Sequence, residues 1–200
     1  MLQNSNNMGL PKFPEFLIST VSDQTKVMAV LFEESDSLIW FTLQNKKFMA
    51  HNWRSYLEFV EAVQKRLNGL CDEVECEGIS SRGVDHLANI IAAHPRLGEP
   101  KKTLSIYSTS EQQSLQSSDS KETQEKLQFL NGQYEEKYEG LRFIVFVNGR
   151  SRAEIMKIMN ARINSGNSWY EEARIAINEM CLVAKDRAQK FAPECQIHRM

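Results

Sequence analysis

The sequence has 200 residues, of which 42% are hydrophobic and 25% are charged, a composition that suits a globular protein with one full core. The formal net charge of −2 provides no strong field for nucleic acid or for an acidic membrane surface. Apolar runs such as residues 143–147 are far shorter than a bilayer span requires. We therefore expect no nucleic-acid partner and no membrane partner.

The cysteines indicate free thiols in a reducing compartment. Cys71, Cys76, Cys181 and Cys195 show no C-x-x-C spacing, and the first residues lack the apolar core of a secretory signal peptide. Cys71 and Cys76 with His86 are too few ligands for a metal site, so we expect no metal. We expect a cytoplasmic location; a peroxisomal one stays open, although the sequence has no Ser-Lys-Leu type ending.

In chain order, the predicted elements are an N-terminal arm and a series of amphipathic helices. Residues 1–15 are polar with two prolines and are expected to form a flexible arm, and residues 16–200 are expected to form one helical domain. Capping boxes at Ser55 and Ser151 mark two helix starts, and a charged stretch at residues 71–78 breaks the apolar pattern. The predicted helices lie at residues 27–35, 55–70, 80–94, from 108 onward, 127–134, 151–163 and 169–191.

Residues 142–147 form the one convincing β-like run, because they are rich in β-branched and aromatic side chains. A single strand cannot make a sheet, so this segment is predicted to be an extended connector between helices. The predicted fold class is therefore all-α: a single-domain multi-helix bundle with one short extended segment at about residues 142–147.

His94 is a polar residue in register with an apolar helical stripe. It follows Leu87 by seven residues, Ile90 by four and Ile91 by three, and Pro95 disfavours continuation of the helix. One interpretation is a core histidine whose ring is satisfied by a backbone carbonyl. The other is a partly buried imidazole, which titrates near pH ~6.5 and suits proton transfer to a bound substrate.

Arg162 also stands in register with apolar residues, Ile158 and Met159. A buried guanidinium keeps its charge and needs an anionic partner. That partner is either a carboxylate of the protein or a carboxylate of a ligand, which a guanidinium binds in bidentate fashion. The spacing leaves both alternatives open.

The acidic residues have ready structural explanations. Glu111 completes a capping box with Ser108, and that role alone accounts for its position. The paired acids at residues 33–34, 135–136 and 171–172 are interpreted as solvated helix faces.

Short motifs at these positions follow one another in a characteristic order. The sequence reads A-H-P-R-L-G, S-T-S-E-Q, L-N-G-Q-Y, F-I-V-F-V-N-G-R-S and R-I-N at residues 93–98, 108–112, 130–134, 143–151 and 162–164. In this order they resemble the motifs of the 2-oxo-4-hydroxy-4-carboxy-5-ureidoimidazoline (OHCU) decarboxylases. With a looser echo at residues 31–35, the resemblance covers roughly residues 28–190.

The resemblance implies an all-helical carboxy-lyase of urate breakdown, which converts OHCU to (S)-allantoin with loss of carbon dioxide and without a metal or organic cofactor. It also implies a small-molecule substrate and a homodimer. By motif position, His94 would be the catalytic histidine, Glu111 would orient it and Arg162 would hold the substrate. The pocket residues implied in the same way are Pro95, Ser108, Gln112 and, through their backbone groups, Phe143, Ile144, Val145, Phe146 and Val147.

Some positions depart from the family pattern. Arg96 stands beside His94 where an acidic residue is common, and residues 72–80 resemble an insertion. Two alternatives therefore stay open. One is a catalytically silent helical interaction protein of the same fold, and the other is a decarboxylase of a related ureido acid whose specificity is altered by Arg96.

Overall fold

A computed structural model describes residues 9–78, 82–99 and 120–193 of this protein. The regular structure in these ranges is helical. These ranges contain nine α-helices and no strands, which confirms the all-α prediction. Across the described parts of the chain, the helices are too short or too polar to serve as a membrane span. In chain order the helices are α1 (Phe13–Ile18), α2 (Val21–Phe32), α3 (Asp36–Phe41), α4 (Lys46–Met49), α5 (Tyr56–Glu77), α6 (Arg82–Ala92), α8 (Lys121–Lys137), α9 (Arg152–Ile163) and α10 (Trp169–Phe191).

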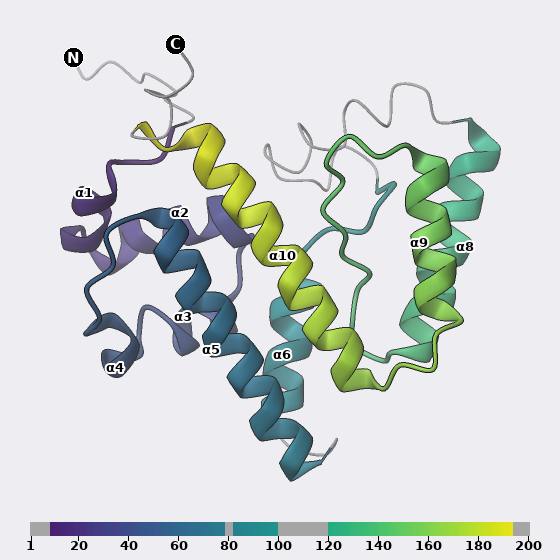
Figure 1. Ribbon diagram of the computed structural model, residues 1–200, viewed down its shortest axis with the longest axis horizontal. Coiled ribbons are helices and arrows are strands. Elements are labelled where there is room, and N and C mark those ends of the chain that lie inside the picture. Colours follow the sequence, from purple (N-terminus) through teal and green to yellow (C-terminus); the bar gives the residue numbers. More distant parts are fainter. Residues whose placement is uncertain (1–8, 79–81, 100–119, 194–200) are drawn as a thin grey trace.

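The long helix α10 is the centre of the fold. It packs against α5, α2 and α6, while α8 packs against α9. In Figure 1, α10 crosses the middle of the molecule, with α2 and α5 on one side and the pair of α8 and α9 on the other. Small side chains allow neighbouring helices to approach closely. The fully buried alanines of α10 are Ala173, Ala176, Ala184 and Ala188.

Capping side chains set the helix starts that the sequence predicts. Ser151 accepts a hydrogen bond from the Glu154 N–H, and the Glu154 carboxylate bonds back to the Ser151 N–H, so this capping box is confirmed. Ser55 accepts from the Glu58 N–H at 3.2 Å. The Glu58 carboxylate, however, accepts from the Arg54 N–H at 2.9 Å, so only half of the predicted box forms.

Helix α5 continues through the break that the sequence predicts at residues 71–78. Cys71 and Val74 are buried and prolong the apolar stripe of Leu67, while the charged residues between them face outward. The helix ends where Gly78 adopts a φ of 93°, a left-handed conformation that favours glycine. The predicted break was therefore wrong, because the apolar period continues beneath the charges.

The described residues of the segment predicted to be an N-terminal arm, residues 9–15, pack on the core. Leu10 and Phe13 are buried, and the Leu10 N–H donates to the Phe191 carbonyl at 2.8 Å. The chain therefore joins the core from Leu10 onward, because the apolar face of α1 packs on α2. Residues 1–8 lie outside the described residues.

The predicted connector is present as an extended segment without strand pairing. We call residues 140–147 the strap. In Figure 1 the strap runs beside α10, between that helix and α9. Contacts with α6 hold one end of the strap, and hydrogen bonds with α9 and α10 hold it along its length.

Candidate active site

His94 lies just beyond the C-terminal end of α6. Its N–H donates to the Ile91 carbonyl at 3.2 Å, and Pro95, which has no N–H, follows it. The residue is only 5% exposed, yet neither ring nitrogen has a hydrogen-bond partner among the described residues. Buried polar groups in proteins are nearly always bonded, so two open nitrogens call for an explanation. The described residues do not provide the backbone carbonyl that a purely structural histidine would use.

The surroundings of His94 keep its imidazole neutral. Burial, together with the positive charges of Arg187 and Arg142, lowers the pKa of His94 from its ordinary 6.5 to about 4, while the negative charge of Glu33 acts in the opposite direction. A neutral imidazole has one N–H donor and one acceptor nitrogen. At neutral pH the His94 ring is therefore uncharged, with one nitrogen that can donate a hydrogen bond and one that can accept one.

A buried ion pair supplies two of these charges. Arg187 on α10 is 1% exposed and donates through Nη2 to Glu33 at 2.8 Å and through Nη1 to the Val30 carbonyl at 3.0 Å. Glu33 ends α2 with a φ of 66°, which is uncommon for a residue other than glycine. The interpretation of Glu33 as part of a solvated helix face was therefore wrong, because its carboxylate neutralises the buried Arg187.

The strap is tied to the α6 end that carries His94. Arg142 Nη1 donates to the His94 carbonyl at 2.9 Å. Gly140 adopts a φ of 82°, and a Cβ at this position would lie 3.1 Å from the Ala88 Cβ on α6. Gly140 therefore allows the strap to approach α6 closely, and Arg142 fixes it beside the histidine.

Arg162 has a protein carboxylate as its partner, which answers the question that the sequence left open. Its Nε donates to Glu172 at 2.9 Å and its Nη2 donates to the Tyr134 hydroxyl at 3.1 Å. Tyr134 in turn donates to Glu172 at 2.8 Å, and Arg162 Nη1 donates to the Ile144 carbonyl of the strap at 2.7 Å. The guanidinium also lies 4.6 Å from the centre of the Phe143 ring. Arg162 therefore holds the strap in place.

Glu172 contradicts its interpretation as part of a solvated helix face, since it is 0% exposed. The signal was present in the sequence, because Glu172 precedes Ala176 by four residues and Met180 by eight, both on the buried face of α10. A carboxylate in this register predicts a buried cationic partner.

Part of the strap backbone has no hydrogen-bond partner among the described residues. The Phe146 N–H donates to Glu179 on α10 at 2.6 Å, and the Phe146 carbonyl accepts from Arg150 at 2.7 Å. Val145 is buried, but within the described residues neither its N–H nor its carbonyl forms a hydrogen bond. Because buried backbone groups are almost always paired, these two groups call for a partner outside the described residues.

The other predicted site residues differ in how deeply they are buried. Phe143 and Ile144 are buried, like Val145, whereas Phe146, Val147 and Pro95 are partly buried. The positions predicted for Ser108, Glu111 and Gln112 lie outside the described residues. The described residues therefore bring His94, the strap and Arg162 into one connected set of contacts.

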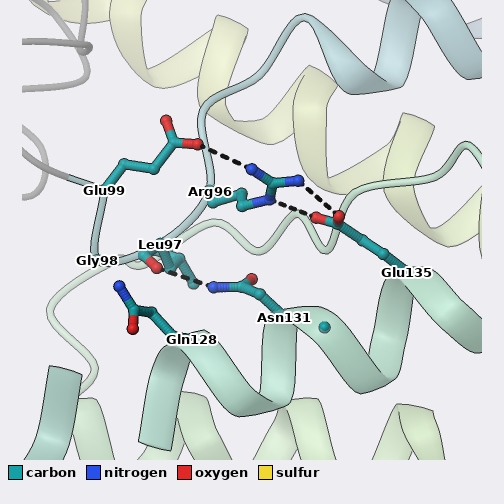
Figure 2. A pocket seen from close by; sticks show the side chains of 8 residues that line it. Arg96, Leu97, Gly98, Glu99, Gln128, Asn131 and Glu135 are labelled. Carbon is teal, nitrogen blue, oxygen red and sulfur yellow. Dashed lines mark hydrogen bonds and ion pairs between the residues drawn. The ribbon is translucent and has the colours of Figure 1, made fainter. Parts of the chain in front are cut away.

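Arg96 is neutralised by an acid of α8. Its Nε and Nη2 donate to the two Glu135 oxygens at 2.6 and 2.7 Å, and its Nη1 lies 3.6 Å from Glu99, as Figure 2 shows. Asn131 donates to the Leu97 carbonyl at 3.1 Å and anchors the same loop. Between the loop and α8 is a pocket of about 400 Å³, and its lining does not include His94. The lining residues are Arg96, Leu97, Gly98, Glu99, Gln128, Asn131, Gly132 and Glu135.

The thiols and acids of the described residues do not form a metal site. Groups of three or more His, Cys, Asp or Glu side chains suited to a metal ion are absent from the described ranges. Cys71, Cys76 and Cys181 are free thiols. Burial raises the pKa of Cys71 to about 11 and that of Cys181 to about 12, so both remain protonated at neutral pH.

Comparisons with known proteins identify the family. Residues 19–189 match the family model described as OHCU decarboxylase, and the chain belongs to this family. The fold is similar to a crystal structure of (S)-allantoin synthase, with a TM-score of 0.60 and 15% sequence identity over 91% of this chain and 54% of that one. It is also similar to a crystal structure of OHCU decarboxylase in the presence of (S)-allantoin, with a TM-score of 0.56 and 20% identity over 82% of this chain and 94% of that one.

At 15% and 20% sequence identity, these two structural matches establish similarity of fold alone. The chain spans about half the length of the (S)-allantoin synthase and nearly all of the OHCU decarboxylase. A search of curated proteins gives no match.

Proposed function

We propose that this protein catalyses the decarboxylation of OHCU to (S)-allantoin, without a metal or an organic cofactor, and that His94 is the acid–base residue. The observation that carries the proposal is a buried, neutral imidazole whose two nitrogens are unbonded within the described residues. Arg142 ties the strap to the His94 carbonyl, and within the described residues the Val145 backbone of the strap forms no hydrogen bond. Membership in the OHCU decarboxylase family supports the choice of substrate.

The proposed reaction breaks one carbon–carbon bond. When carbon dioxide leaves, its bonding electron pair moves into the neighbouring imine of the substrate ring, so the ring itself accepts the electrons. The substrate hydroxyl then loses a proton and becomes the ring carbonyl, while the carbon that carries the ureido group gains a proton on one face. The ring nitrogen that receives the electron pair takes up one proton from solvent, which is the one proton consumed overall, since the carboxylate leaves as neutral carbon dioxide.

His94 is suited to both proton movements. Its acceptor nitrogen takes the hydroxyl proton, and the imidazolium returns a proton to the ureido-bearing carbon, which sets the (S) configuration. A positioned acid–base group of this kind contributes roughly 10²–10⁴-fold to a rate. In this proposal Glu111, which lies outside the described residues, orients the ring, and Ser108, Gln112 and Pro95 line the pocket.

Arg162 contributes mainly through the strap. Of its five N–H groups, those on Nε and Nη2 bind Glu172 and Tyr134, and one on Nη1 binds the Ile144 carbonyl. One Nη1 N–H remains for the substrate, so we assign Arg162 a single hydrogen bond to the ligand instead of a bidentate grip. The strap that it holds then binds the planar ring through the Val145 backbone.

The test is an assay with substrate generated in situ from urate by upstream enzymes. Purified wild-type protein is expected to accelerate the loss of substrate absorbance and the growth of (S)-allantoin circular dichroism. His94→Ala is expected to lower the rate by ~10²-fold or more while the far-ultraviolet dichroism of the fold is retained. No acceleration by folded wild type would contradict the proposed reaction and favour a silent interaction protein.

The second alternative, a related ureido acid, depends on Arg96. Because Glu135 neutralises this arginine, its charge is directed away from a substrate and we favour OHCU itself. Arg96→Asp is therefore expected to destabilise the loop at residues 95–99 rather than to change the preference among ureido acids. The expected homodimer stays a prediction, which size-exclusion chromatography with light scattering tests.

A further inference from the structure

A second cavity, of about 370 Å³, lies between α4 and α5 and shares no lining residue with the pocket in Figure 2. One wall comes from α4 and the turn after it, and the other comes from positions spaced three and four residues apart on α5, which share one helix face. Its lining residues are Phe48, His51, Trp53, Ala62, Lys65, Arg66 and Gly69.

The first wall is an ordered aromatic surface. Phe48 and Trp53 have ring centres 4.8 Å apart, and Trp53 packs edge-on against the buried Phe59 at 5.0 Å. His51 lies nearly parallel to Trp53, at 19° and 6.1 Å. Its Nδ1 is 3.0 Å from the Lys47 carbonyl, which only accepts, so this nitrogen carries the proton. These contacts hold the rings in place and present them to a planar ligand.

Gly69 keeps the opposite wall open. It lies within the long helix α5, where glycine is less favourable than alanine. A Cβ at Gly69 would meet no atom within 4 Å, and the φ of Gly69 is not left-handed. Neither close packing nor backbone conformation therefore requires glycine here. The missing side chain leaves room inside the cavity.

Two cations stand at the rim. Lys65 is exposed, and its ammonium forms no ion pair with another described residue. Arg66 lies over the Phe41 ring at 5.4 Å and 3.5 Å from Glu73, and among the described residues no other carboxylate forms an ion pair with this rim. Two positive charges against one negative charge favour an anionic group at the mouth of an aromatic cavity.

We propose that this cavity binds a small planar aromatic anion, with its ring against Phe48 and Trp53 and its anionic group between Lys65 and Arg66. Charge complementarity and the open position of Gly69 select this class of ligand. The proposal does not depend on the reaction at His94, so each can fail without the other.

The probe is 1-naphthoate, titrated into the full chain by calorimetry and by NMR of the tryptophan indole N–H signals. We expect a Kd of ~0.1–1 mM, typical of a ligand of this size. The Trp53 indole signal should move, while those of Trp40 and Trp169 stay in place. The neutral 1-naphthamide and the non-aromatic cyclohexanecarboxylate should bind about tenfold more weakly, because each lacks one of the two interactions.

Two variants locate the site. Gly69→Leu fills the cavity and should weaken naphthoate binding at least about tenfold, since the ring has no space. The matched control is Gly132→Leu on α8, where a Cβ also meets nothing within 4 Å, and it should leave the Kd unchanged. Lys65→Gln with Arg66→Gln alters only the rim and should also weaken binding about tenfold.

Absence of naphthoate binding up to about 10 mM, the weak end of fragment affinities, would overturn the proposal. Equal binding to the Gly69→Leu variant, or tight binding of the neutral amide, would overturn it as well. If Gly69→Leu does not fold, as judged by far-ultraviolet dichroism, the rim variant and the Trp53 signal decide the question.

Discussion

His94 and Arg162 are both buried polar residues, but their surroundings differ. Arg162 is bonded to Glu172, Tyr134 and Ile144, so its charge is neutralised within the protein. His94 has no hydrogen-bond partner on either ring nitrogen among the described residues, and arginines lie nearby. The same feature of the sequence indicates both residues: a polar side chain in register with an apolar helical stripe.

This difference in hydrogen bonding indicates a structural role for Arg162 and a chemical role for His94. A buried charge that is neutralised and bonded within the protein stabilises one conformation, as Arg162 mainly does for the strap. A buried group left open costs stability, and such groups are common where a ligand binds. We therefore expect changes at the Arg162 network to act on stability, and changes around His94 to act on chemistry and on its pKa.

The largest effect on stability is expected from Glu172→Gln. Removal of one charge from a buried ion pair leaves the other charge uncompensated and costs ~3–5 kcal/mol. Urea unfolding measures the loss. The control is Asp72→Asn in the more exposed pair with Arg174, which should cost less than ~1 kcal/mol. Equal losses in the two variants would remove the contrast between His94 and Arg162.

The pH dependence of stability is expected to show the neutral state of His94. Because its pKa is about 4 in the folded protein and 6.5 ordinarily, the unfolded chain takes up the proton first as the pH falls. The associated stability is fully present above pH 6.5 and is lost toward pH 4, by up to ~3 kcal/mol. The measurement is the free energy of unfolding of wild type minus that of His94→Asn between pH 7 and 4. A constant difference would show that His94 is not held neutral.

Arg142→Gln is expected to lower kcat/KM about tenfold, because it releases the His94 carbonyl and loosens the strap. It also removes a charge that lowers the pKa of His94, so the acid limb of the pH–rate profile should move to higher pH. Arg150→Gln, which releases the Phe146 carbonyl on the same strap, is the control and should not move that limb. An unchanged profile for Arg142→Gln would leave the arginine a purely structural role.

The smallest effect is expected from Gly140→Ala, at ~1–2 kcal/mol, since a side chain is strained at its φ and crowds Ala88. Gly149→Ala is the matched control, because Gly149 has a φ of 75° but open space around its missing Cβ. The difference between the two losses isolates the contact of the strap with α6. Equal losses would mean that this close approach contributes nothing.

The local features of the fold could be predicted from the sequence. Apolar period predicted α9 and α10, the Ser151 cap predicted the start of α9, and Pro95 predicted the end of α6 near His94, because these signals act within a few residues. The extended, unpaired conformation of residues 142–147 was also predictable, since a lone β-like run has no partner strand. The continuation of α5 was missed because surface charges hide the period of Cys71 and Val74.

The polar pairs could not be predicted, because their partners are far apart in the chain. Glu33 and Arg187 form an ion pair although they are 154 residues apart in the chain. The register of Glu172 indicates that it is buried, but no spacing identifies Arg162 as its partner. The roles of Ser108, Glu111 and Gln112 remain predictions from the motif alone.

The central claim is that the His94 ring is neutral and open to a ligand. NMR of protein labelled with ¹⁵N in its histidines measures both properties directly, with His94→Asn used to assign the signals. The account predicts a neutral imidazole at pH 7 whose ring nitrogen signals shift when (S)-allantoin is added. A protonated ring at pH 7, or nitrogen signals that saturating (S)-allantoin leaves unmoved, would contradict it.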